Sequence, residues 1–227
     1  MCLIKPKNEE TYKIDGCFVD EKERFAFIHI YKNASISLRN ALGMRGRYYK
    51  WNDVKDNGLK TITIIRNPID RVISMYLYLL RLEDNDRPDQ HPIHLTENTC
   101  FYKERENVIQ SFYKFLIAIE GGNYYDAVTC PQIGFLNDRN LTINDIDEVF
   151  VQENMAVEFP KFVMKYKLED VNPIFPIDNR GNDEKKKIIT EYLNTHFFTK
   201  LDIMEAYASD IDMYNRIVNK RNKNLII

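Results

Sequence analysis

Six consecutive residues, Lys32 to Ser37, bring together an ammonium, an amide and two hydroxyls. The apolar run Phe25 to Ile30 before them predicts a strand buried on both faces, and the spacing of Leu38, Ala41 and Leu42 after them predicts a helix. A strand-turn-helix of this kind can hold a phosphate with backbone N–H groups at the positive end of the helix. The residues expected to bind it are Lys32, Asn33, Ala34, Ser35, Ile36 and Ser37.

The turn differs from the Walker phosphate loop in two ways. It contains no glycine, and Lys32 precedes Ser35 and Ser37 by three and five residues instead of standing directly before a serine. An ordinary kinase or GTPase is therefore less favoured.

A second strand-turn-helix follows at Thr61 to Arg81, TITIIRNPIDRVISMYLYLLR. Thr61 to Ile65 is β-branched throughout, and Asn67 and Pro68 are the residue types of an N-cap and a first helical residue. Arg66 therefore stands at the carboxyl end of the strand, at the edge where open α/β sheets bind ligands.

The helix after Pro68 has an apolar stripe that must face a core. Its members are Ile69, Val72, Ile73, Tyr76, Leu77 and Leu80. Helical geometry places Asp70, Arg71, Ser74 and Arg81 on the other, polar side. A guanidinium and a hydroxyl suit a terminal phosphate, so Arg66 and Ser74 are expected to hold a second anion. A salt bridge from Arg66 to Asp70 is the structural alternative.

Two phosphate-suited turns fit a nucleoside with phosphates at both ends, and here the chain resembles the carbohydrate (Golgi-type) sulfotransferases. That family uses 3′-phosphoadenosine 5′-phosphosulfate (PAPS). Its first turn reads close to IHIPKTAGTSL where this chain has IHIYKNASISL, and its second reads close to RDPIERFLSAY where this chain has RNPIDRVISMY. The resemblance implies that Lys32, Ser35 and Ser37 hold the 5′-phosphosulfate, and that Arg66 and Ser74 hold the 3′-phosphate.

Weaker similarities to the family extend the resemblance to about Ile217. They are the Pro131-Gln132 pair, the run VFVQENMAVEF around Glu153 and Asn154, the helix IMEAYASDIDMYNRI from Ile203, and the segment FPIDNRG, which implies Arg180 as a third phosphate contact. The chain also departs from the family. Tyr31, Asn33 and Ile36 replace a proline and two threonines, and no histidine precedes the Pro-Gln pair.

The resemblance implies in-line transfer of a sulfuryl group from PAPS to a hydroxyl or amine, through a loose transition state like that of phosphoryl transfer. Lys32 is the residue expected to stabilise charge on the leaving phosphate, and the scheme needs no metal. A hydroxyl acceptor also needs a general base. His91 and His94 are the catalytic candidates because they lie in a polar loop, whereas His29 lies in the first strand and His196 in the late helical region. A carboxylate, Asp86 or Asp89, is the alternative.

Composition limits the class of protein. The 227 residues are 44% hydrophobic and 29% charged, which is ordinary globular usage, and a net charge of −2 predicts no nucleic-acid partner. The four cysteines, Cys2, Cys17, Cys100 and Cys130, lack the CxxC spacing of a zinc site and predict reduced thiols in the cytoplasm. The sequence contains no stretch of eighteen apolar residues, so no membrane segment is expected.

The sequence thus predicts one α/β domain over residues 1–227, a three-layer sandwich with a central parallel sheet flanked by helices, like the P-loop-related sulfotransferases. We expect a lead-in at 1–24 with an edge strand at 17–20, a nucleotide-binding core at 25–81, and an acceptor loop at 84–98. A helix at 108–119, a strand at 148–152, and C-terminal helices at 184–196 and 201–219 (within 183–219) complete it.

The expected function is sulfuryl transfer from PAPS to an acceptor, with carbohydrate favoured by resemblance. Two alternatives remain open: a kinase-like phosphotransferase that uses Mg²⁺ and ATP, and a nucleotide-binding protein without catalysis. The identity of the acceptor and the oligomeric state do not follow from the sequence.

Overall fold

The computed structural model describes residues 16–44, 48–84, 107–120, 128–176 and 183–224. The strands are β1 (Gly16–Val19), β2 (Phe25–Ile28), β3 (Tyr48–Lys50), β4 (Lys60–Ile65) and β5 (Glu148–Val151). The α-helices are α1 (Ser35–Ala41), α2 (Trp51–Val54), α3 (Pro68–Asp84), α4 (Val108–Glu120), α5 (Gln132–Asn137), α6 (Met155–Lys165), α7 (Asp183–Thr195), α8 (Phe197–Ala206) and α9 (Ala208–Asn224). Two short 3₁₀ helices are η3 (Ile143–Asp145) and η4 (Gln152–Asn154).

The five strands form one mixed sheet in the order β3-β1-β2-β4-β5. β2, β4 and β5 run parallel, with Ile28 beside Thr63 and Ile65 beside Val151. The predicted parallel strands are therefore confirmed, but the sheet is not parallel throughout. β1 pairs antiparallel with both β2 and β3, so the strand expected at the edge lies inside the sheet.

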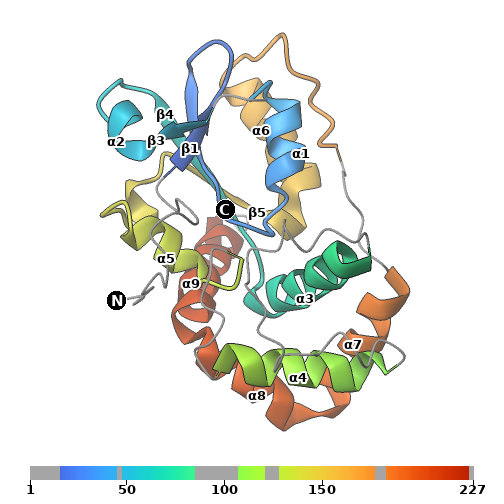
Figure 1. The fold of residues 1–227 in the computed structure, drawn as a ribbon. Helices are drawn as coiled ribbons and strands as arrows, with labels where there is room; N and C mark the ends of the chain where they lie inside the picture. The colour runs from blue at the N-terminus through green and yellow to red at the C-terminus, as the bar shows by residue number, and fades with distance from the viewer. Residues whose placement is uncertain (1–15, 45–47, 85–106, 121–127, 177–182, 225–227) are drawn as a thin grey trace.

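Helices cover both faces of the sheet. Side chains of successive strand residues point to opposite faces, and in β2 both sets are apolar, so each face needs a covering layer. Phe25 and Phe27 of β2 pack with α1 and α6, whereas Ala26 and Ile28 pack with α2, α5 and α9. Figure 1 shows α1 and α6 together beside the strands, with α5 and α9 grouped elsewhere around them. The layers are thus helix, sheet and helix, as the expected α/β class requires.

A second group of helices, α3, α4, α7 and α8, has an apolar core of its own (Figure 1). Tyr76 of α3 lies with its ring centre 5.2 Å from that of Phe112 and 5.6 Å from that of Phe115, both on α4. The predicted helix at 108–119 is confirmed. The predicted helix at 201–219 is instead two helices, α8 and α9, separated at Tyr207. Tyr207 is buried and donates its hydroxyl to the carbonyl oxygen of Thr129, 2.8 Å away.

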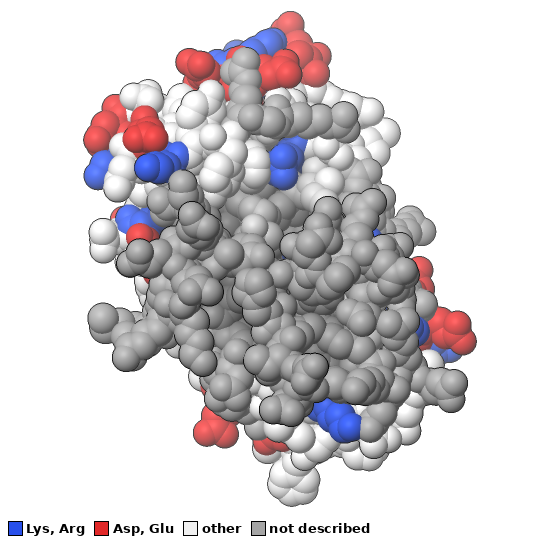
Figure 2. All heavy atoms as spheres, in the orientation of Figure 1, with Lys and Arg blue, Asp and Glu red and all other residues white. Residues whose placement is uncertain are grey.

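Charged side chains on the surface are mixed in sign. In Figure 2, acidic and basic groups stand close together around the margins of the face shown. No helix in the part of the chain that the structure describes has the length and apolar character needed to cross a membrane. Cys17 and Cys130 are buried thiols that form no disulfide.

Candidate anion-binding site

The two predicted turns meet at one edge of the sheet. Lys32 follows β2, and Arg66 directly follows the adjacent parallel strand β4. The guanidinium Nη1 of Arg66 donates a hydrogen bond to the carbonyl oxygen of Lys32 at 3.0 Å. The fold therefore brings the two cations that the sequence singled out into one site, as the shared carboxyl edge of parallel strands predicts.

The first turn has an unusual backbone. Lys32 and Ala34 adopt left-handed conformations, with φ of 68° and 52°. Residues other than glycine seldom adopt this conformation, which costs roughly 1–2 kcal/mol for each residue. Left-handed residues in a turn also direct successive N–H groups to one side, an arrangement that binds anions. Backbone strain of this kind is concentrated at functional sites, which supports the assignment of the turn.

Two side chains of the turn hold it in place. The fully buried Asn33 donates from Nδ2 to the carbonyl oxygen of Ile64 at 2.8 Å and to Gln132 Oε1 at 2.7 Å. Ser35 Oγ donates to the carbonyl oxygen of Ile30 at 2.9 Å. These bonds occupy the Asn33 amide and the Ser35 hydroxyl and fix the backbone of the turn, so the charged side chain that the turn offers to a ligand is that of Lys32. Among the other predicted residues of the turn, Ser37 is buried and Ile36 is exposed.

The Lys32 ammonium lies over an aromatic ring among other cations. Its Nζ is 4.1 Å from the ring centre of Tyr78, and the Arg81 guanidinium is 5.6 Å from the same centre. Within the described ranges Lys32 makes no ion pair with a carboxylate. Burial, followed by repulsion from Arg81, Arg66 and Arg71, lowers the pKa of Lys32 from 10.5 to about 7. A bound anion would reverse much of that shift, because it favours the charged ammonium.

The expected alternative for Arg66, a salt bridge to Asp70, is not found in the part of the chain that the structure describes. The cation paired with Asp70 is Lys186, with 3.8 Å between Nζ and Oδ1. Burial lowers the pKa of Arg66, while Asp70 and Glu153 act at longer range in the opposite direction. Arg66 Nε is buried and has no hydrogen-bond partner among the described residues. A phosphate oxygen is an acceptor that this donor could use.

The interpretation of Arg71 as a polar-face residue is wrong. Arg71 is fully buried, and it donates from Nε to the carbonyl oxygen of Tyr31 at 3.0 Å and from Nη2 to that of Val128 at 3.2 Å. The long side chain reaches from α3 to the first turn, and two of its guanidinium nitrogens donate to main-chain oxygens. Ser74 lies partly exposed on the same helix, and no hydrogen bond joins it to Arg66 or Lys32 among the described residues.

Gln132 connects the two turns, a role that sequence reasoning did not assign to it. Its Oε1 accepts from Asn33 Nδ2 at 2.7 Å and from the Arg66 backbone N–H at 2.9 Å, and its Nε2 donates to the Arg66 carbonyl oxygen at 2.9 Å. The buried Asp210 of α9 accepts from the backbone N–H groups of Gln132 at 2.7 Å and Ile133 at 2.9 Å. The only sequence signal for this network was the Pro131-Gln132 pair.

The start of α3 is fixed in a similar way. Asn67 Oδ1 accepts from the N–H groups of Ile69 at 3.0 Å and Asp70 at 3.3 Å, which confirms the predicted N-cap. Glu153 accepts from the Asn67 N–H at 3.0 Å and from the Tyr214 hydroxyl at 3.3 Å. Burial and the Glu153 carboxylate raise the pKa of Tyr214 to about 12. Glu153 therefore stabilises the turn that carries Arg66.

Comparison with protein-family models, curated proteins and solved structures gave no match. The assignment of the site therefore depends on its own geometry and on the sequence patterns above.

Several predicted residues lie outside the described residues. They are His91, His94, Arg180 and the alternative bases Asp86 and Asp89. Of the other histidines, His196 is exposed, and its ring stacks on that of Tyr192 with 4.0 Å between centres. His29 packs 4.5 Å from the Tyr31 ring, and its pKa is lowered to about 3 by burial and by Arg39 and Arg139. In the described part of the chain no three His, Cys, Asp or Glu side chains are grouped to hold a metal ion.

Proposed function

We propose that this protein binds PAPS and transfers its sulfuryl group to an acceptor hydroxyl or amine, with a carbohydrate as the favoured acceptor. One observation carries the proposal: the Lys32 ammonium and the Arg66 guanidinium follow adjacent parallel strands and are joined through the Lys32 carbonyl oxygen. Neither makes an ion pair with a carboxylate among the described residues. The finer assignment of the fold, a P-loop-related sulfotransferase domain, belongs to the same proposal.

The electrostatics favour a ligand with several negative charges. Arg71 and Arg81 add positive charge near Lys32, which is why repulsion contributes to the lowered pKa of its ammonium. Uncompensated like charges in a partly buried site cost free energy that a bound polyanion recovers. A nucleoside with a 3′-phosphate and a 5′-phosphosulfate supplies two such groups, one for each turn.

The two cations differ in chemistry, and the proposal gives them different roles. The Arg66 guanidinium offers planar paired donors to the 3′-phosphate, with its buried Nε as the open position. The Lys32 ammonium, on a flexible stem, faces the 5′ side. The cation–π interaction between this ammonium and the Tyr78 ring is weaker than an ion pair between the ammonium and a phosphate. The ammonium can therefore leave the ring and pair with the ligand.

In the proposed reaction, the acceptor oxygen or nitrogen forms a bond to the sulfuryl sulfur while the bond from sulfur to the bridging phosphate oxygen breaks. The leaving phosphate keeps that electron pair, and the acceptor proton passes to a base. Lys32 neutralises the charge that develops on the bridging oxygen. Because the bound nucleotide raises the pKa of Lys32, this ammonium is protonated in the complex at neutral pH.

The test is calorimetric titration of the full chain with 3′-phosphoadenosine 5′-phosphate, compared with ATP plus Mg²⁺. The proposal requires a clear preference for the bisphosphate, and weaker binding of the bisphosphate in Lys32→Met but not in Lys161→Met, a control on the exposed side of α6. Preference for Mg-ATP would replace the proposal with a kinase. Binding of the bisphosphate without sulfuryl transfer from PAPS across a panel of acceptors would indicate a non-catalytic binding protein.

A further inference from the structure

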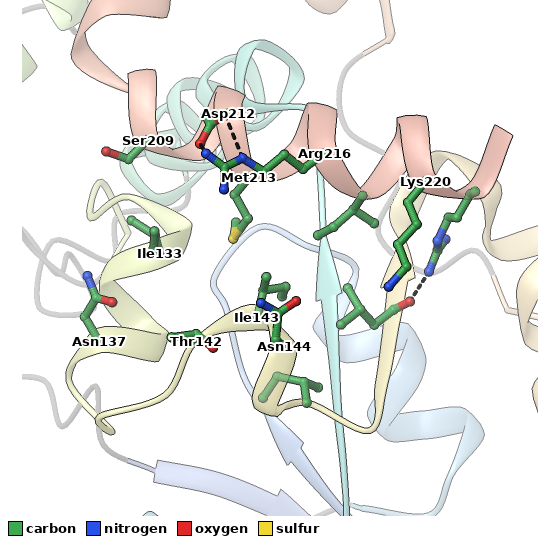
Figure 3. A pocket seen from close by; sticks show the side chains of 14 residues that line it. Ile133, Asn137, Thr142, Ile143, Asn144, Ser209, Asp212, Met213, Arg216 and Lys220 are labelled. Atoms are coloured by element: carbon green, nitrogen blue, oxygen red, sulfur yellow. Dashed lines mark hydrogen bonds and ion pairs between the residues drawn. The ribbon is translucent and has the colours of Figure 1, made fainter. Parts of the chain in front are cut away.

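A second concave site lies away from the two turns. It is a pocket of about 700 Å³ bounded by α9, α5, the η3 turn and β5 (Figure 3). None of the residues that line it belongs to the Lys32 and Arg66 turns. The volume falls within the range of roughly 300–1,000 Å³ that small-molecule sites occupy.

The floor of the pocket is apolar. It is formed by Ile133, Ile143, Ile146, Val149, Met213 and Ile217. Figure 3 shows Met213 pointing from α9 into the space above the η3 turn, and Asn144 pointing back from that turn. The polar lining residues stand around this floor, so a ligand would meet hydrocarbon inside and polar groups at the rim.

The charged residues of the rim are mostly basic, although the whole chain has a net charge of −2. They are Arg216, Lys220 and Arg221, with Asp212 as the acidic member. Arg216 is paired with Asp212, with 3.0 Å between Nε and Oδ1. Arg221 is paired with Glu158 and also donates to the carbonyl oxygen of Val149.

Lys220 differs from the two arginines. Within the described ranges it has no ion pair, and in Figure 3 its side chain extends from α9 toward the pocket. The available charge of the pocket is therefore one ammonium at the edge of an apolar floor. This combination is complementary to a single negative group attached to a hydrocarbon body.

We propose that this pocket binds an amphipathic organic anion, whose hydrocarbon body lies against Met213 and Ile143 and whose anionic head pairs with Lys220. The apolar body supplies most of the binding free energy because it is removed from water. The head group selects for charge, because the Lys220 ammonium offers an anion a charge-assisted hydrogen bond at the rim. The proposal is independent of the nucleotide site.

The test is titration of the full chain with octanoate. Binding is measured by calorimetry and by the NMR chemical shifts of the α9 backbone amides. We expect saturable binding with one site, at least tenfold weaker binding of octan-1-ol, and about tenfold weaker binding of octanoate in Lys220→Gln. Lys161→Gln, which removes an exposed lysine outside the pocket, should bind octanoate like the parent protein.

A steric variant provides the second arm. Asn144→Trp places a large side chain at an exposed position of the rim and should abolish binding of octanoate while leaving the thermal unfolding midpoint close to that of the parent protein. If this variant fails to fold, Lys220→Gln decides the matter, because Lys220 is exposed and supports no described contact. The proposal is overturned by the absence of saturable binding, by equal affinity for octan-1-ol, or by an equal loss in Lys220→Gln and Lys161→Gln.

Discussion

The guanidinium of Arg66 donates a hydrogen bond to the carbonyl oxygen of Lys32, 3.0 Å from Nη1. This bond joins the residue that follows β4 to the turn after β2. It therefore fixes the positions of Arg66 and Lys32 relative to each other. The bond satisfies one donor of Arg66 and leaves its buried Nε without a partner among the described residues. The backbone of the site is therefore held by hydrogen bonds, while its two cations have no carboxylate partner among the described residues. This is the state expected of an anion site before the anion binds.

Replacing Arg66 tests its assignment to the 3′-phosphate. In Arg66→Ala, the affinity for 3′-phosphoadenosine 5′-phosphate should fall by a factor of about 100, because charge-assisted hydrogen bonds to phosphate are worth roughly 1.5–3 kcal/mol. The affinity for adenosine 5′-phosphate should change much less. Calorimetry with both nucleotides measures the difference. Arg66→Lys keeps the charge without the paired donors and should be intermediate, whereas an equal loss for both nucleotides would remove Arg66 from the 3′ site.

Lys32 should make the stability of the ligand-free protein depend on pH. Its pKa is about 7 in the folded state and 10.5 ordinarily, so between these values the unfolded chain binds more protons. The free energy of unfolding contributed by Lys32 therefore rises with pH from about 7 to about 10.5, and its unfavourable effect is complete below pH 7. We expect Lys32→Met to be more stable than the parent protein at pH 6, with a difference that shrinks toward pH 10.

Urea unfolding at pH 6, 8 and 10 measures this effect, and Lys161→Met is the matched control on an exposed helix face. A constant difference between Lys32→Met and the parent protein at all three pH values would contradict the lowered pKa. Saturating 3′-phosphoadenosine 5′-phosphate should reverse the ranking at pH 7, since the parent protein gains stability from the ligand that the variant binds poorly.

Gln132 should act as a positioning residue for both turns. Gln132→Met removes the acceptor of Asn33 Nδ2 and of the Arg66 N–H, and leaves buried donors unsatisfied. We expect a loss of about 3 kcal/mol in the free energy of unfolding. We also expect weaker binding of 3′-phosphoadenosine 5′-phosphate at temperatures where the variant is fully folded. Gln132→Glu keeps an acceptor, but it places a carboxylate oxygen against the Arg66 carbonyl oxygen and a charge in a fully buried position, so it should also be destabilised.

The two readouts separate positioning from simple stability. If Gln132→Met unfolds more easily but the folded variant binds the bisphosphate like the parent protein, Gln132 supports the fold alone. A parallel loss of affinity for the bisphosphate and for adenosine 5′-phosphate would agree with displacement of both turns.

The sequence predicted the features that local pattern controls. Runs of β-branched and aromatic residues predicted β2, β4 and β5, and Asn67 before Pro68 predicted the start of α3, because caps and strands depend on neighbouring residues. The convergence of Lys32 and Arg66 also followed, since parallel strands end at a common edge. These predictions needed no knowledge of distant contacts.

The features that sequence reasoning missed depend on contacts between distant segments. A helical wheel places Arg71 on the polar side, yet its guanidinium finds main-chain oxygens at Tyr31 and Val128 and is fully buried. Gln132 meets Asn33 across 99 positions of sequence and meets the carboxylate of Asp210 across 78. β1 lies inside the sheet because β3, a strand of three exposed residues without apolar alternation, pairs beside it.

His29 should contribute to acid unfolding. Burial, Arg39 and Arg139 lower its pKa from 6.5 to about 3, so it is neutral in the folded protein. As the pH falls from 6.5 to 3, the unfolded chain takes up a proton that the folded protein does not, and stability is lost in this window. His29→Phe keeps an aromatic ring beside Tyr31 and should reduce the slope of stability against pH there. The exposed His196→Phe is the control, and an unchanged slope in His29→Phe would contradict the burial of a neutral imidazole.

The left-handed backbone of the first turn predicts an unusual effect of glycine. Ala34 has a φ of 52°, a conformation that a glycine adopts without strain. Ala34→Gly should therefore raise the free energy of unfolding by up to about 1 kcal/mol, because relief of strain exceeds the added entropy of the unfolded chain. Ala118→Gly, in the middle of the regular helix α4, is the matched control and should lower stability by about 1 kcal/mol. Thermal and urea unfolding of the two variants measure the contrast, and destabilisation by both to the same extent would show that Ala34 is not left-handed in solution.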